Sequence, residues 1–169
     1  MILIAIGANL STEFGRSPKE SCEWATRRLA EIVNVNLVSR SPWYLSEAIP
    51  PSGHPAYING IVRLEGTPEP SWLLARLHEI EAESGRIRHQ INDPRTLDLD
   101  LIDLNGVISA GPTPILPHPR AHLRAFVLLP LRDVAPEWVH PALGQTASDL
   151  LAGLPPQPIV PLARAHPIA

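Results

Sequence analysis

The pattern of apolar and polar positions divides the chain into strands and helices. A continuous apolar run opens the chain, as in buried strands, and later apolar residues recur at alternate positions or at helical spacing. The pattern predicts strands over residues 2–6, 35–46, 57–64 and 96–104. It predicts helices over residues 18–33, 67–84, 124–134 and 146–154. Pro42 interrupts the second strand, and Pro130 lies inside the third helix.

This order of elements predicts an α+β fold with a ferredoxin-like βαββαβ core. The core is expected to be a largely antiparallel sheet with helices packed on it, followed by a C-terminal hairpin and further helices. Asn105–Gly106 has the composition of a type I′ hairpin turn and leads into residues 107–108. With 169 residues and no internal repeat or clear linker, the chain is expected to form a single domain over residues 1–169. A proline-rich tail from about residue 155 is expected to lie extended over the surface.

The strand over residues 96–104 places two carboxylates on one face. Asp98 and Asp100 are two positions apart, with their Cα atoms about 7 Å from one another, while the intervening leucines face the core. Aspartate disfavours strands and like charges repel, so a cation between the two carboxylates would explain the pattern. Mg²⁺ suits a few carboxylates combined with phosphate oxygens. For the two aspartates taken alone, a solvated strand face is the alternative.

Cations gather on both sides of this strand, although the net charge of the chain is −3. Arg86 and Arg88 precede the strand, Arg95 stands at its start, and a second basic segment contains His118 and Arg124. Together with Mg²⁺, these side chains would match the charge of a triphosphate. Two alternatives stay open: arginines that are merely solvated, and a mixed nitrogen and oxygen metal site that uses the histidines of the second segment.

Further candidates lie on the second helix and the third strand. His78 and Glu81 are three residues apart on one helix face, with Glu81 at the edge of the apolar stripe. Tyr57 and Asn59 share a strand face, and Phe126 follows the second basic segment. Two aromatic rings and an amide could hold a planar bicyclic ligand, although the residues alone favour a core role for both rings.

Composition narrows the classes of function. An acidic chain with 5% aromatic residues argues against a nucleic-acid-binding module. The opening apolar run is too short and lacks the basic flank of a signal peptide, and no run approaches the length that crosses a bilayer. Cys22 is the single cysteine and is expected to be a buried thiol in a reducing compartment. We therefore expect a cytoplasmic protein, monomeric or weakly dimeric, without nucleic-acid or membrane partners.

Residues 94–101, Pro-Arg-Thr-Leu-Asp-Leu-Asp-Leu, resemble the signature of the 6-hydroxymethyl-7,8-dihydropterin pyrophosphokinase family of folate biosynthesis. The resemblance runs from residue 4 to about residue 139 and includes the turn at residues 7–10 and the segment at residues 118–126. It implies transfer of the β,γ-diphosphoryl group of ATP to 6-hydroxymethyl-7,8-dihydropterin, which gives AMP and the pterin diphosphate. A non-catalytic homologue that binds pterin or nucleotide is the alternative function.

The resemblance also implies roles for individual residues. Asp98 and Asp100 would hold two Mg²⁺ ions, and the catalytic residues would be Arg86, Arg95, Asp98 and Asp100. ATP would contact His78, Glu81, Arg88, His118 and Arg124. The pterin would contact Tyr57, Asn59, Asp98 and Phe126. Residues 86–93 are a candidate lid. The chain departs from the family pattern at Leu45, His78 and Asp93, which leaves the loop mechanics and the kinetics open.

Overall fold

The computed structural model describes residues 1–47, 53–85 and 95–164. Its strands are β1 (Ile2–Ala8), β2 (Val35–Arg40), β3 (Tyr44–Ser46), β4 (Tyr57–Gly66), β5 (Asp98–Leu104), β6 (Ser109–Ala110), β7 (Ile115–Leu116) and β8 (Ile159–Pro161). Its helices are α1 (Pro18–Ala30), α2 (Pro70–Glu83), α3 (Ala125–Val134) and α4 (Ala147–Ala152). Short 3₁₀ turns cover Ala121–Leu123 and Leu162–Arg164. The predicted α+β class is confirmed.

The main sheet has six strands. Five of them follow the order β5-β1-β4-β3-β8, and β2 pairs with the half of β4 that β3 leaves uncovered. Each of these pairings is antiparallel. The order of elements up to β5, together with this order of strands, is compatible with the predicted ferredoxin-like core.

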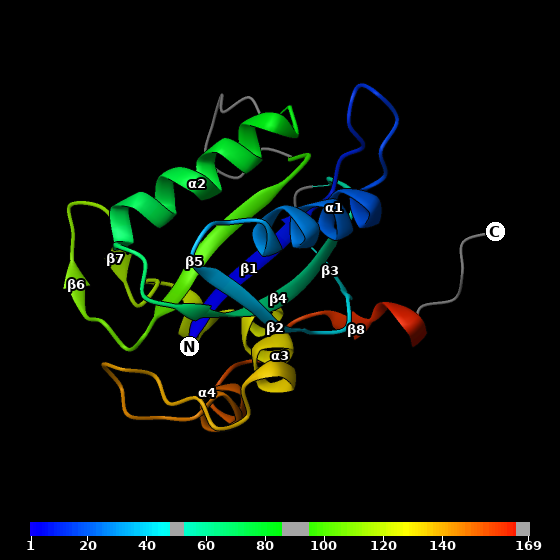
Figure 1. Ribbon diagram of the computed structural model, residues 1–169. Coiled ribbons are helices and arrows are strands. Elements are labelled where there is room, and N and C mark those ends of the chain that lie inside the picture. The colour runs from blue at the N-terminus through cyan, green and yellow to red at the C-terminus, as the bar shows by residue number, and fades with distance from the viewer. Residues whose placement is uncertain (48–52, 86–94, 165–169) are drawn as a thin grey trace.

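Helices cover both faces of the sheet (Figure 1). The apolar sides of α1 and α2 pack in one cluster with Ile4 of β1 and with the leucines of β5. Leu3, Ile61 and Ile102 point to the other face and pack against α3 and α4. Because successive side chains of a strand point to opposite faces, the same strands supply both cores. As predicted, Cys22 of α1 is buried, and this burial raises the pKa of its thiol to about 12. None of the described helices is long and apolar enough to cross a membrane.

The strand predicted over residues 35–46 is divided in two at Ser41–Pro42. Proline has no N–H to give to a sheet. The Ser41 Oγ replaces a backbone acceptor and accepts a hydrogen bond from the Ile61 N–H at 2.9 Å. Trp43 then lies against Gly60, where an added Cβ atom would come within 2.5 Å of the indole ring. The break therefore combines a proline between β2 and β3 with a glycine on β4 that leaves room for Trp43.

The turn after β5 is present, but it does not form the predicted hairpin with residues 107–108. Asn105 and Gly106 have positive φ angles of 53° and 73°, and the Val107 N–H donates to the Leu104 carbonyl at 3.0 Å. The Asn105 amide binds the Met1 amino group and the Gly66 carbonyl, which fastens the turn to β1 and β4. β6 pairs with β7 instead of β5, and these two strands make a separate short hairpin.

The proline-rich tail contributes a strand to the main sheet. β8 pairs with β3 and extends the main sheet, with Val160 opposite Leu45. The Leu162 N–H donates to the Trp43 carbonyl at 2.9 Å, and the Leu162 side chain packs against the core below α1. Up to residue 164 the tail is thus part of the fold. The assignment of residues 1–169 to one domain stays a prediction.

Candidate active site

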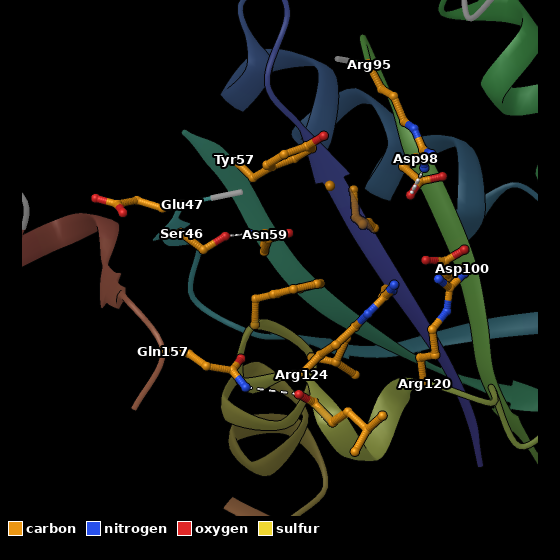
Figure 2. A pocket seen from close by; sticks show the side chains of 16 residues that line it. Ser46, Glu47, Tyr57, Asn59, Arg95, Asp98, Asp100, Arg120, Arg124 and Gln157 are labelled. Carbon is orange, nitrogen blue, oxygen red and sulfur yellow. Dashed lines mark hydrogen bonds and ion pairs between the residues drawn. The ribbon is translucent and has the colours of Figure 1, made fainter. Parts of the chain in front are cut away.

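A cavity of about 460 Å³ lies on the α3 side of the sheet (Figure 2). The sheet contributes Ala5, Ile6, Gly7, Ser46, Tyr57, Asn59, Asp98 and Asp100. The start of α3 and the segment before it contribute Arg120, Leu123, Arg124, Phe126 and Val127. Arg95, Glu47 and Gln157 complete the lining. The cavity therefore gathers residues from both ends of the chain and from its middle.

Strand register sets the positions of the polar residues in this cavity. Gly7 pairs with Asn59 on one side and with Asp98 on the other, so these three residues form one row across β4, β1 and β5. Asp100 stands opposite Ala5 in a second row. Asn59 and Asp98 are two strand spacings apart, or about 10 Å between Cα atoms. The small side chains of β1 leave the space between them open.

Asp98 and Asp100 line the cavity, and the leucines beside them are buried, as the alternation predicts. The Arg95 Nη1 donates to the Asp98 Oδ2 at 2.7 Å, and both side chains are 21% exposed. Backbone contacts fix this arginine, because the Asn9 side chain accepts from the Arg95 N–H at 2.8 Å. The N–H groups of Asn9 and Leu10 donate back to the Arg95 carbonyl. The turn after β1 therefore positions the start of β5.

A second set of cations faces the aspartates. Burial lowers the pKa of Arg124, as does Arg120, while the charges of Asp100 and Asp98 raise it. Burial and these two arginines lower the pKa of His118 to about 4, so its imidazole is neutral at pH 7. The His118 Nδ1 accordingly accepts from the Arg120 N–H at 3.1 Å. An anion bound beside Arg120 and Arg124 would relieve the repulsion between them.

The other end of the cavity is aromatic. Tyr57 of β4 and Phe126 of α3 are both half-buried and line it, which differs from the core role that the residues alone favour. The Asn59 amide nitrogen donates to the Ser46 Oγ, which fixes the plane of the amide (Figure 2). A Cβ atom at Gly7 would lie 3.1 Å from the Asn59 Oδ1, so glycine keeps this approach open. One end thus suits a charged group and the other a flat ring.

Several predicted residues do not line the cavity. His78 is exposed on α2. Leu45, a position where the chain departs from the family pattern, packs against the core cluster that contains α1. His118 is half-buried outside the lining, and its backbone N–H donates to the Ile102 carbonyl at 2.9 Å. Glu81 is buried, with 3% of its surface exposed, and its Oε2 accepts from the Leu99 N–H at 3.0 Å. The predicted residues Arg86 and Arg88 and the candidate lid at residues 86–93 lie outside the described residues.

Glu81 of α2 hydrogen-bonds to β5, the strand that carries Asp98 and Asp100, on the edge that does not pair with β1. Replacing it with leucine removes a charged acceptor from the Leu99 N–H, so we expect a loss of about 1.5–3 kcal/mol in the free energy of unfolding. Glu81→Gln keeps an acceptor and should lose less. Glu79→Gln is a control on the same helix, because that side chain is 56% exposed, and it should change stability by less than about 0.5 kcal/mol. Urea unfolding measures the free energy of unfolding of the three variants. A Glu81→Leu protein as stable as the wild type would contradict a stabilising role for the Glu81–Leu99 hydrogen bond.

The donor atoms in the cavity fit Mg²⁺ bound together with phosphate. Among the described residues, no group of three His, Cys, Asp or Glu side chains could hold a metal ion by itself. Asp98 and Asp100 offer two carboxylates, which is the share of ligands that proteins give to Mg²⁺ when substrate phosphates supply others. His122 does not join them, since its ring packs against His140 with centroids 5.8 Å apart.

Some cavity residues are not signalled by the sequence. Gly7 and Ala5 acquire their role from pairing with strands more than fifty positions away. Glu47 and Gln157 lie in segments with no local pattern that indicates a site. Glu47 reaches the cavity because β3 pairs with β4, and Gln157 because β8 pairs with β3. Arg120 stands in the basic segment, so its charge is the one local signal among these residues.

Comparisons with known proteins agree with this geometry. The family model described as 7,8-dihydro-6-hydroxymethylpterin-pyrophosphokinase matches residues 3–136. A 2-amino-4-hydroxy-6-hydroxymethyldihydropteridine pyrophosphokinase of Pseudomonas aeruginosa is 35% identical over 91% of each chain. One from Synechocystis is 36% identical over 88% of this chain and 73% of its own. A folic acid synthesis protein of Schizosaccharomyces pombe is 30% identical over 92% of this chain, which is 21% of that protein. The chain therefore belongs to the 7,8-dihydro-6-hydroxymethylpterin-pyrophosphokinase family.

Proposed function

We propose that this protein transfers the diphosphoryl group of ATP to the hydroxymethyl group of 6-hydroxymethyl-7,8-dihydropterin and releases AMP. As a member of its family it is an ATP-dependent pyrophosphokinase of folate biosynthesis. One observation carries the assignment of substrates to the cavity: the row from Asn59 through Gly7 to Asp98 joins its aromatic end to its charged end. A ring bound at Tyr57 would then direct its substituent towards Asp98.

The charged end is proposed to bind the triphosphate. Asp98 and Asp100 would hold Mg²⁺, expected as two ions, and the metal would neutralise charge on the phosphate oxygens. Arg124 and Arg120 would bind phosphate from the opposite wall. Arg95 pairs with Asp98 and is proposed to contact a phosphate when that carboxylate holds a metal ion. These groups position the reactants and stabilise charge, which is what phosphoryl-type transfer requires.

The aromatic end is proposed to bind the pterin. Tyr57 and Phe126 would stack on its faces, and Asn59, held by Ser46, would hydrogen-bond to its edge. The hydroxymethyl oxygen would attack the β-phosphorus of ATP and release its proton to solvent. The bond between that phosphorus and the oxygen of the α-phosphate would break, and AMP would leave with that oxygen. Asp98 stands closest in register to the aromatic end, so we assign it the contact with the hydroxymethyl group.

Three further predictions accompany this proposal. Glu81 lies on the far edge of β5, so we propose that it positions the acidic strand rather than contacting ATP. A free buried thiol and the need for ATP support a cytoplasmic location. A monomer or weak dimer that binds small molecules and no nucleic acid stays a prediction.

Product analysis tests the proposal. Purified protein is incubated with MgATP and 6-hydroxymethyl-7,8-dihydropterin, and the nucleotides and pterins are separated and identified. We expect AMP and the pterin diphosphate in equal amounts, and no product when EDTA replaces Mg²⁺. Formation of ADP would indicate a simple kinase and contradict the proposal. Pterin binding without turnover would favour the non-catalytic homologue, which the presence of both aspartates in the cavity argues against.

A further inference from the structure

We propose that Gln157 in the C-terminal tail is a positioning residue that holds the start of α3, so that Arg124 and Phe126 face the cavity. The match to the family model ends at residue 136, so the tail lies outside it. The catalytic meaning of this inference rests on the proposed function. The hydrogen bonds of Gln157 are made within the chain and can be tested separately.

The Gln157 amide holds the backbone on both sides of Arg124. Its Oε1 accepts from the Ala125 N–H at 2.9 Å, and its Nε2 donates to the Leu123 carbonyl at 3.0 Å, the bond drawn from Gln157 in Figure 2. The first N–H groups of a helix have no partner within the helix, and no side chain from the start of α3 caps it. A glutamine from a distant segment therefore supplies the cap.

The tail that carries Gln157 is itself fixed to the pterin side of the cavity. β8 pairs with β3, whose Ser46 holds the Asn59 amide. The Pro158 carbonyl also accepts from the Glu47 N–H at 3.4 Å. Gln157 thus links the strand that orients Asn59 to the helix that carries Phe126. Through this link the tail sets the distance between two walls of the proposed pterin site.

The two residues that Gln157 positions are neighbours with different proposed roles: Arg124 binds phosphate and Phe126 stacks on the pterin. Arg124 faces the aspartates, and Phe126 belongs to the aromatic end, with the Arg124 guanidinium 5.4 Å from the centre of its ring. At the far end of α3, Asp133 accepts a hydrogen bond from the Tyr44 hydroxyl. Without Gln157 the helix would keep that anchor but lose the one beside Arg124. Small displacements of positioned groups are costly in catalysis, up to about 100-fold for 1 Å.

Three variants separate positioning from folding. Gln157→Met keeps the length of the side chain and removes both hydrogen bonds, while Gln157→Glu keeps an acceptor for the Ala125 N–H. Val160→Thr is the matched control, because Val160 is 46% exposed on β8 and does not line the cavity. We expect kcat/KM for the pterin to fall about tenfold in Gln157→Met and about threefold in Gln157→Glu. The control should stay within about twofold of the wild type.

Amide exchange tests the same contact without turnover. In the ligand-free protein, Gln157→Met is expected to speed hydrogen exchange of the Ala125 amide about tenfold, measured by NMR, with no change in Val160→Thr. An unchanged Ala125 amide overturns the inference. So does a Gln157→Met protein that melts at a lower temperature but keeps wild-type kinetics when folded, or an equal loss in the Met and Glu variants. A wild-type protein without turnover would overturn the proposed function, while the exchange rates would still decide whether Gln157 holds the helix.

Discussion

Replacing Asp98 or Asp100 with asparagine is expected to lower turnover by more than about 10³-fold while the protein stays folded. Asparagine keeps the shape of the side chain and removes the charge that Mg²⁺ and the triphosphate require. Both carboxylates face the cavity and are partly exposed, so neither supports the core. The measurement is AMP formation with saturating MgATP and pterin, together with the melting temperature of each variant.

Asp103 provides a control on the same strand. It is buried, with 4% of its surface exposed, and it accepts hydrogen bonds from the Trp138 indole and the Gly106 N–H. Asp103→Asn should lower stability and leave kcat within about threefold of the wild type, since surface and core changes outside a site act mainly on folding. Wild-type turnover in either cavity variant would contradict the metal assignment. Because Asp98 shares a row with Asn59, Asp98→Asn should also weaken pterin binding, and Asp100→Asn should not.

Replacing Phe126 with leucine is expected to weaken pterin binding by about 10- to 100-fold, the range for losing one aromatic stacking partner. Leucine keeps the apolar contact with the core beside α3 and removes the flat ring. MgATP binding should change less than pterin binding, because Phe126 reaches the proposed triphosphate site only through its contact with the Arg124 guanidinium. Titration of the pterin in the presence and absence of MgATP measures both affinities.

Trp72→Leu is the matched control for Phe126→Leu. This aromatic residue is 37% exposed on α2, stacks on Arg76 and does not line the cavity. Its replacement should leave the dissociation constant of the pterin unchanged. Equal pterin affinities in Phe126→Leu and wild-type protein would show that the pterin does not stack on Phe126. Equal losses of pterin and MgATP affinity would indicate a general loss of structure.

The sequence predicts the parts of the site that depend on local periodicity. Alternation along residues 96–101 separates buried leucines from the two aspartates, and Tyr57 and Asn59 share a strand face for the same reason. Helix α2 begins at Pro70 instead of residue 67, because Glu69 accepts from the N–H groups of Ser71 and Trp72 and so acts as the cap. A boundary of this kind depends on one side chain rather than on a pattern.

Other features of the site depend on register and on contacts between distant segments. The row of Asn59, Gly7 and Asp98 exists only after three strands have paired, and no local signal fixes which residues stand opposite one another. Glu81 lies at the edge of an apolar stripe, but only the packing of α2 beside β5 directs its carboxylate to Leu99. Gln157 becomes part of the site because a proline-rich tail pairs with β3.

The most direct test of the central claim follows the β-phosphorus of ATP through the reaction. ATP labelled at the β-phosphate is mixed with Mg²⁺, 6-hydroxymethyl-7,8-dihydropterin and the protein, and the label is traced in the separated products. Diphosphoryl transfer predicts that the label appears in the pterin product, that the AMP is unlabelled, and that the transfer is lost in Asp98→Asn. A label that stays with the nucleotide as ADP, or a transfer that survives in Asp98→Asn, would contradict the account.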